Sequence, residues 1–143
     1  MQGINIFSGE SGLGGALTNP TALARRKGNI EHRYPIKVNG VAYQDVELAY
    51  HAFKTGDAAS DNDMMANLIA QKLLDHPSLM AEVTERGGLP FLEVCSHITY
   101  ARSSGGQAWE GYGRDSRFIR NMMSGYEIAL SGTARHFGQT SLF

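Results

Sequence analysis

The amino-acid sequence predicts a predominantly helical α+β fold, built as a single domain over all 143 residues with one small β-hairpin. Apolar residues recur with the 3.6-residue period of a helix in three stretches, 46–53, 64–73 and 118–130. Asn39-Gly40 separates two short alternating runs, and this pair favours a hairpin because both turn residues must take positive φ. With 42% apolar residues, the chain is long enough to form one hydrophobic core.

Charge and cysteine content narrow the function classes. The chain has 13 basic and 14 acidic residues, which argues against bulk binding to duplex nucleic acid but not against a small nucleotide pocket. The single cysteine, Cys95, has no internal disulfide partner, so we expect a reducing compartment. No apolar run has membrane-spanning length and residues 1–4 start no signal peptide. A cytoplasmic protein of bacterial or viral type without a membrane partner is therefore expected.

The N-terminal region predicts a short strand at 4–7 and then a glycine-rich loop at 8–20. Successive amides in such a loop can form a nest for phosphate, although a flexible connector is an equal interpretation. It is not a Walker loop, because it lacks the Gly-Lys-Ser/Thr ending. A small basic cluster follows, either solvated or facing phosphates at this loop. Its members are Arg25, Arg26, Lys27 and Arg33.

The hairpin, expected over 36–43, leads directly into a helix. Asp45 has the position of an N-cap, and Gly56 is expected to close the helix. The apolar stripe consists of Val46, Ala49, Tyr50 and Phe53, and an adjoining stripe consists of Glu47, His51 and Lys54. A carboxylate in the first helical turn beside aromatic residues suits catalysis or ligand binding, but such a stripe is also common on a solvated helix face.

Two further helices are expected before residue 89. Asp61 or Asp63 is the predicted cap of the first, which carries Met64, Met65, Leu68, Ile69 and Leu73 as core residues. Pro77 starts the second, and Gly87-Gly88 ends it. The segment 89–99 fits either a buried strand or a helix that starts after Pro90, and periodicity does not decide between them.

The last strong helix has Asp115 or Ser116 as its cap and Gly132 as its end, before a short tail to Phe143 that we expect to be loosely held. Its predicted inward residues are Phe118, Ile119, Met122, Met123, Tyr126 and Leu130.

The only tryptophan, Trp109, lies in a glycine-rich loop near Tyr112. This suggests a platform on which a flat ring can stack, and the alternative is a lid over the edge of the core. Cys95 and His97 have no matching Cys or His pair, so zinc binding is not expected and a buried thiol is favoured over a Cys–His nucleophile.

Residues 40–54 resemble the YbiA-like, or NADAR, family. Its hallmark is Gly-x-x-Tyr, then Val-Glu-His-Ala-Tyr-Gln-Ala, then Lys two residues later. Leu48 and His51 differ from this pattern, while Asn19 and Trp109 are similar to an upstream Asn and a downstream Trp. The positions that match the hallmark are Gly40, Tyr43, Val46, Glu47, Ala49, Tyr50, Ala52 and Lys54.

The resemblance implies a multihelical fold around buried central helices and an N-glycosidase that acts on ribosylated nitrogen. The implied substrates are a nucleotide, ADP-ribose on a nucleobase (free or in nucleic acid), or a phosphorylated pyrimidine of riboflavin synthesis. The catalytic Glu of the family falls on Glu47, and its ligand-holding Asn and Trp fall on Asn19 and Trp109. No metal or cofactor is required.

This chemistry agrees with the residue types, because a carboxylate beside C1 can stabilise an oxocarbenium-like state and activate water. Further expected ligand-binding residues are Tyr50, His51, Lys54, Arg114 and the amides of Gly14 and Gly15. Two alternatives stay open. One is a module that sequesters a nucleotide without cleaving it, and the other is a helical interaction protein in which Glu47 is an ordinary surface carboxylate.

Overall fold

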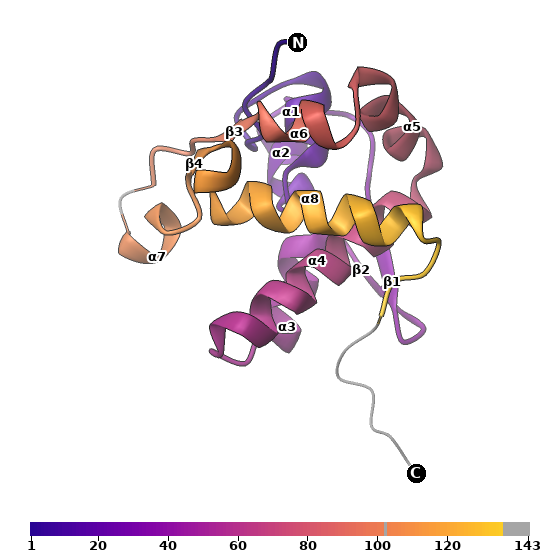
Figure 1. Ribbon diagram of the computed structural model, residues 1–143. Coiled ribbons are helices and arrows are strands. Elements are labelled where there is room, and N and C mark those ends of the chain that lie inside the picture. The colour runs from indigo at the N-terminus through magenta and orange to yellow at the C-terminus, as the bar shows by residue number, and fades with distance from the viewer. Residues whose placement is uncertain (102, 136–143) are drawn as a thin grey trace.

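The computed structural model describes residues 1–101 and 103–135, and it confirms a predominantly helical α+β fold (Figure 1). The predicted tail beyond residue 135 lies outside the described residues. The helices are α1 Gly12–Leu17, α2 Thr21–Arg26, α3 Val46–Phe53, α4 Ala58–Asp75, α5 Pro77–Arg86, α6 Leu89–Glu93, α7 Ser104–Gln107 and α8 Arg117–Leu130, with the 3-10 turn η1 Gly113–Asp115. The strands are β1 Ile36–Val38, β2 Val41–Tyr43, β3 Ser96–His97 and β4 Gly111–Tyr112.

The core is centred on α4 and α8, and α8 runs through the middle of the molecule (Figure 1). The two helices approach closely at Gly125, where an added Cβ would lie 2.8 Å from the carbonyl oxygen of Ala66 and 2.8 Å from Cγ2 of Ile69. The predicted core residues of both helices are buried, with one correction. Leu130 is 60% exposed, because it lies in the last turn of α8 beyond the packed face.

The predicted hairpin is confirmed. Strands β1 and β2 pair antiparallel around Asn39 and Gly40, whose φ angles are 54° and 79°. The cap of α3 is also as predicted, because Asp45 accepts the Leu48 amide at 2.9 Å. The helix ends at Phe53 rather than near Gly56, since the backbone is already extended at the next residue.

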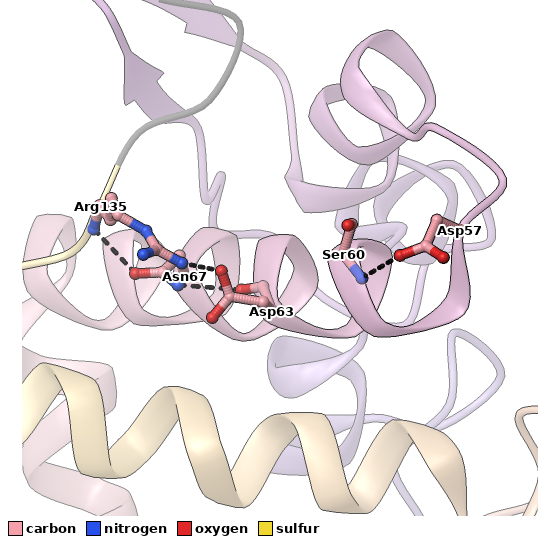
Figure 2. A network of polar contacts seen from close by, with 5 residues as sticks. All are labelled: Asp57, Ser60, Asp63, Asn67 and Arg135. Atoms are coloured by element: carbon pink, nitrogen blue, oxygen red, sulfur yellow. Dashed lines mark hydrogen bonds and ion pairs between the residues drawn. The ribbon is translucent and has the colours of Figure 1, made fainter.

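The start of α4 differs from the prediction, because Asp57 is its cap and accepts the Ser60 amide at 2.9 Å (Figure 2). Asp61 lies inside the helix, where its carboxylate accepts the amides of Thr55 and Gly56 at 2.8 Å each. This carboxylate therefore holds the α3–α4 connection in its turn.

Asp63 is also no cap, and it forms an ion pair with Arg135 (Figure 2). The amide of Arg135 donates to Oδ1 of Asn67 at 2.8 Å. These contacts attach the segment after α8 to the exposed side of α4.

Two N-terminal predictions are wrong. The expected strand at 4–7 is reduced to one bridge between Asn5 and Ser96. The Ile98 amide donates to the side-chain Oδ1 of Asn5 at 2.9 Å, so it does not continue the backbone hydrogen bonds of a strand pair. The expected loop at 8–20 contains α1, a short buried helix.

The segment 89–99, which the sequence assigned to either a strand or a helix, contains both. Helix α6 has Pro90 in its first turn, and β3 follows it and pairs antiparallel with β4. At the start of the last helix the cap is Ser116, which accepts the Ile119 amide at 3.1 Å. Among the helices of the described ranges, none combines the length and apolar character that crossing a membrane requires.

Candidate functional site

A cleft of about 610 Å³ lies where the N-terminal segment, α2, α3 and the turn after α7 meet. Its size is in the range of pockets that hold drug-sized or nucleotide-sized molecules. Six of the residues predicted to act on the ligand line it, namely Asn19, Glu47, Tyr50, His51, Lys54 and Trp109. These residues come from three separate parts of the sequence, so the fold brings them together.

Glu47 lies in the first turn of α3, and its side chain is 38% exposed. Burial raises the pKa of this carboxyl above its ordinary value, while the charges of His51 and Lys54 lower it and Asp45 raises it further. Nε2 of His51 lies 3.7 Å from Oε1 of Glu47, one helical turn away. Glu47 is therefore a partly desolvated carboxyl near a histidine and a lysine.

Asp45 fixes the position of Glu47 relative to α2. Its carboxylate is buried, with Oδ1 accepting the Leu48 amide and Oδ2 accepting the Ala22 amide, each at 2.9 Å. The Glu47 amide in turn donates to the carbonyl of Asn19 at 3.4 Å. Two of these bonds, donated by the amides of Ala22 and Glu47, thus hold the first turn of α3 to the start of α2.

Asn19 lines the cleft and carries a buried polar atom without a partner in the described structure. Its side chain is buried, and Nδ2 lies 3.2 Å from the sulfur of Met65. Its Oδ1 has no hydrogen-bond partner among the residues that the structure describes. An unpaired buried acceptor is costly, so a donor from a bound ligand would stabilise it.

Trp109 lies between Tyr50 and Arg117. The guanidinium of Arg117 is 3.8 Å from the centroid of the indole, which is a close cation–π contact. The Tyr50 ring meets the indole edge to face at 5.7 Å. Burial raises the pKa of the Tyr50 hydroxyl, and the charge of Arg117 counteracts this. One face of Trp109 is therefore covered by Arg117, and only the remainder of the ring is open to a ligand.

The turn around Trp109 is fixed by hydrogen bonds. Its carbonyl accepts the Ser116 hydroxyl at 2.7 Å and the Phe118 amide at 3.3 Å. The expected partner Tyr112 does not line the cleft and is 72% exposed, because β4 directs it toward a different surface. Tyr50 is the aromatic neighbour of Trp109 instead.

His97, which the sequence suggested only as the partner of Cys95 in a less favoured Cys–His pair, also lines the cleft. Its Nδ1 lies 2.7 Å from the carbonyl oxygen of Ile6. Because a carbonyl only accepts, Nδ1 carries a hydrogen. The ring packs on Phe118 at 4.5 Å, and burial lowers the pKa of His97 below its ordinary value.

Nε2 of His97 forms no hydrogen bond within the described part of the chain, which leaves a neutral imidazole with a free lone pair at the cleft. No sequence signal identified this role, since it depends on Ile6, a contact 91 residues away.

Lys27 is a second cleft residue without an assigned role. Its Nζ donates to the Ser8 hydroxyl at 2.8 Å and lies 4.8 Å from the centre of the Phe7 ring. Together with Lys54 it supplies positive charge to a cleft whose one carboxylate, within the described ranges, is Glu47.

Three predicted ligand-binding residues lie elsewhere. Arg114 pairs with Glu93 at 2.8 Å, on a surface apart from the cleft. Gly14 and Gly15 are buried within α1, where added Cβ atoms would lie 2.4 Å from the Asn5 carbonyl and 2.2 Å from the Glu10 carbonyl. These glycines let α1 pack closely against both carbonyls, and they do not line the cleft.

Cys95 is buried as predicted, and burial raises the pKa of its thiol. Its sulfur donates to the Phe91 carbonyl at 3.3 Å, away from the cleft. In residues 1–101 and 103–135, no group of three or more His, Cys, Asp and Glu side chains has an arrangement that could hold a metal ion.

Comparison with family models, with curated proteins and with solved structures finds no match for this chain.

Proposed function

We propose that the protein is an N-glycosidase that hydrolyses the bond between a ribose C1 and a heterocycle nitrogen, with Glu47 as the catalytic carboxylate. The observation that carries this proposal is the position of Glu47, a half-buried carboxyl with a raised pKa at a nucleotide-sized cleft with an aromatic wall. The resemblance of residues 40–54 to the YbiA-like, or NADAR, family supports the same activity.

In the proposed reaction, the oxygen of water bonds to C1 while the C1–N bond breaks and its electron pair stays on nitrogen. The proton that water loses ends on the departing heterocycle. Glu47, as a carboxylate, stabilises the positive charge on the ribose and orients the water. Partial burial strengthens this effect, because the charge of Glu47 is less screened than in bulk water.

The remaining cleft residues account for binding. The open part of Trp109 and the Tyr50 ring provide aromatic surface for a base, and Oδ1 of Asn19 accepts from a ribose hydroxyl. Nε2 of His97 accepts a hydrogen bond from an amino or ring N–H group. Lys54 attracts ligand phosphate. Substrates of this class are nucleotides, ADP-ribosylated nucleobases and N-ribosyl intermediates of the riboflavin-pathway type.

The test is Glu47→Gln, which keeps the shape of the side chain and removes its charge. Incubation with ADP-ribosylated guanine or an N-ribosyl pyrimidine phosphate, followed by chromatography, measures the released base. We expect at least about a hundredfold loss of rate, in line with general acid–base contributions. Glu127→Gln, on the exposed side of α8, is the matched control. Full activity in the Glu47→Gln protein would refute the mechanism.

The second candidate is a module that binds the nucleotide without cleaving it. The contact between His51 and Glu47 favours it, because a protonated imidazole at 3.7 Å can neutralise the carboxylate that the reaction needs. Both candidates predict that ligand raises the melting temperature, but only the enzyme releases free base with time. His51→Gln would increase turnover if the ion pair restrains Glu47.

A further inference from the structure

A groove of about 260 Å³ lies beside α2, and different residues of this helix line it and the cleft. Arg25 and Arg26 line the groove, together with Arg33 and Tyr34 from the segment that follows the helix. In contrast, Leu23 of the same helix lines the cleft. The basic cluster noted in the sequence is thus divided, and its three arginines form a separate surface.

The turn after α2 explains why the arginines converge. Gly28 has a φ of 80°, and its amide returns to the Arg25 carbonyl at 2.9 Å while the Asn29 amide returns to Ala24 at 3.0 Å. Left-handed glycine with such bonds is a helix C-terminal motif that reverses the chain. The reversed chain carries Glu31, whose carbonyl accepts Nε of Arg25 at 2.9 Å, and then Arg33.

Electrostatics favours an anion in this groove. None of its three arginines forms an ion pair with any residue of the described ranges, and no acidic residue among these ranges lines the groove. Like charges on one concave surface repel each other and concentrate counter-ions. Arg25 is half-buried and held by Glu31 through Nε, so its two terminal nitrogens stay available in a fixed orientation. A planar guanidinium held in this way suits bidentate binding of phosphate.

Thr21 supplies an independent indication of a ligand. It lines the groove and is 1% exposed, and its hydroxyl has no hydrogen-bond partner among the described residues. A buried hydroxyl without a partner costs free energy, and a bound oxyanion would provide one. Arginines without an ion pair and a residue with an unsatisfied hydroxyl, among the described residues, thus line the same groove.

We propose that this groove is a second binding site, which holds the phosphate group of a small molecule through Arg25, Arg26 and Arg33. The volume sets the size of the ligand, because 260 Å³ is below the usual range for drug-sized ligands. Inorganic phosphate, pyrophosphate or the phosphate end of a sugar ester are of suitable size. The site is independent of Glu47, and it would exist whether or not the cleft catalyses hydrolysis.

The test is an NMR titration of the ¹⁵N-labelled full chain with pyrophosphate, in which the amide chemical shifts report binding. We expect the largest shifts in residues 21–35 and at Gln44. Arg25→Gln, Arg26→Gln and Arg33→Gln should each weaken binding about tenfold, as expected for loss of one charge-assisted hydrogen bond. Arg120→Gln is the control, since this exposed arginine on α8 carries the same charge away from the groove.

Three outcomes would overturn the proposal. They are no binding at millimolar pyrophosphate, equal weakening by Arg120→Gln and Arg33→Gln, or shifts confined to the cleft residues around Glu47. Ribose 5-phosphate as a second titrant distinguishes the source of the phosphate, and tighter binding than pyrophosphate at the same residues supports a sugar ester. A single-stranded oligonucleotide that binds the groove more tightly than both would overturn the assignment to a small molecule.

Discussion

Lys72 on α4 should make the stability of this protein rise with pH in the neutral to alkaline range. Its side chain is 2% exposed, and Nζ donates to the carbonyls of Ala16 and Thr18 at 2.5 and 2.8 Å, at the C-terminal end of α1. Burial lowers the pKa of Lys72 to about 7, although Asp45 acts in the opposite direction. The folded protein therefore holds a largely neutral amine above neutral pH.

The sign and size follow from proton linkage. In the unfolded chain the lysine pKa is about 10.4, so between pH 7 and that value the unfolded state binds a proton that the folded state does not. Stability therefore increases with pH across this window. The slope approaches about 1.4 kcal/mol per pH unit, and integration from pH 7 to pH 9 gives about 2 kcal/mol.

The assay is urea denaturation of the unmodified protein, Lys72→Met and Lys37→Met at pH 7, 8 and 9. Lys37 is exposed on β1, so its variant controls for the loss of one positive charge. The free energy of unfolding of the unmodified protein relative to Lys72→Met should increase by about 2 kcal/mol from pH 7 to pH 9. The free energy of unfolding of Lys37→Met should change with pH in the same way as that of the unmodified protein.

If the free energies of unfolding of the unmodified protein and Lys72→Met differ by the same amount at pH 7, 8 and 9, the proposed titration of Lys72 is refuted. If Lys72→Met does not fold, ¹³C NMR of the Lys72 Cε in the unmodified protein measures the same pKa directly. A midpoint near 10 would then refute it.

Three other perturbations have defined outcomes. Gly125→Ala should lower the free energy of unfolding by about 1–3 kcal/mol in urea denaturation, because its Cβ has no room against α4; unchanged stability would show that the helices separate easily. Asp45→Ala should lower the free energy of unfolding by at least about 1 kcal/mol, since it removes a helix cap and the bond to Ala22. Asp57→Ala, at an exposed cap, is the comparison, and an equal loss in both variants would contradict a role of Asp45 beyond capping. ¹⁵N NMR of His97 should show the hydrogen on Nδ1 and a pKa below 6.5. The contribution of His97 to stability then declines as the pH falls below 6.5, because the unfolded state binds the proton more readily. An Nε2–H tautomer would contradict the contact with Ile6.

Local patterns predicted those parts of the fold that depend on neighbouring residues. The Asn39-Gly40 turn and the Asp45 cap are short-range devices, and both form as the sequence indicates. Apolar periodicity located α4 and α8 for the same reason. The identity of the cap at Asp57 was missed, because several acidic residues precede α4 and only the geometry of the turn selects one.

Long-range contacts account for what the sequence left undetermined. Glycine content at 12–15 suggested a loop, but close packing against the Asn5 and Glu10 carbonyls requires glycine inside a buried helix. The grouping of Asn19, Glu47 and Trp109 at one cleft came from the family resemblance and not from periodicity. The role of His97 needs a partner 91 residues away, which no local pattern contains.

The attachment of the first residues to β3 has a consequence for the order in which the cleft assembles. The Ile6 amide donates to Ser96 at 2.8 Å and its carbonyl holds His97, so this wall joins segments about ninety residues apart. Closing so long a loop is costly in chain entropy. We expect this wall to form late in folding and to open before α4 and α8 separate. Amide hydrogen exchange at Ile6 would then be faster than in the central helices, and a ligand in the cleft would slow it.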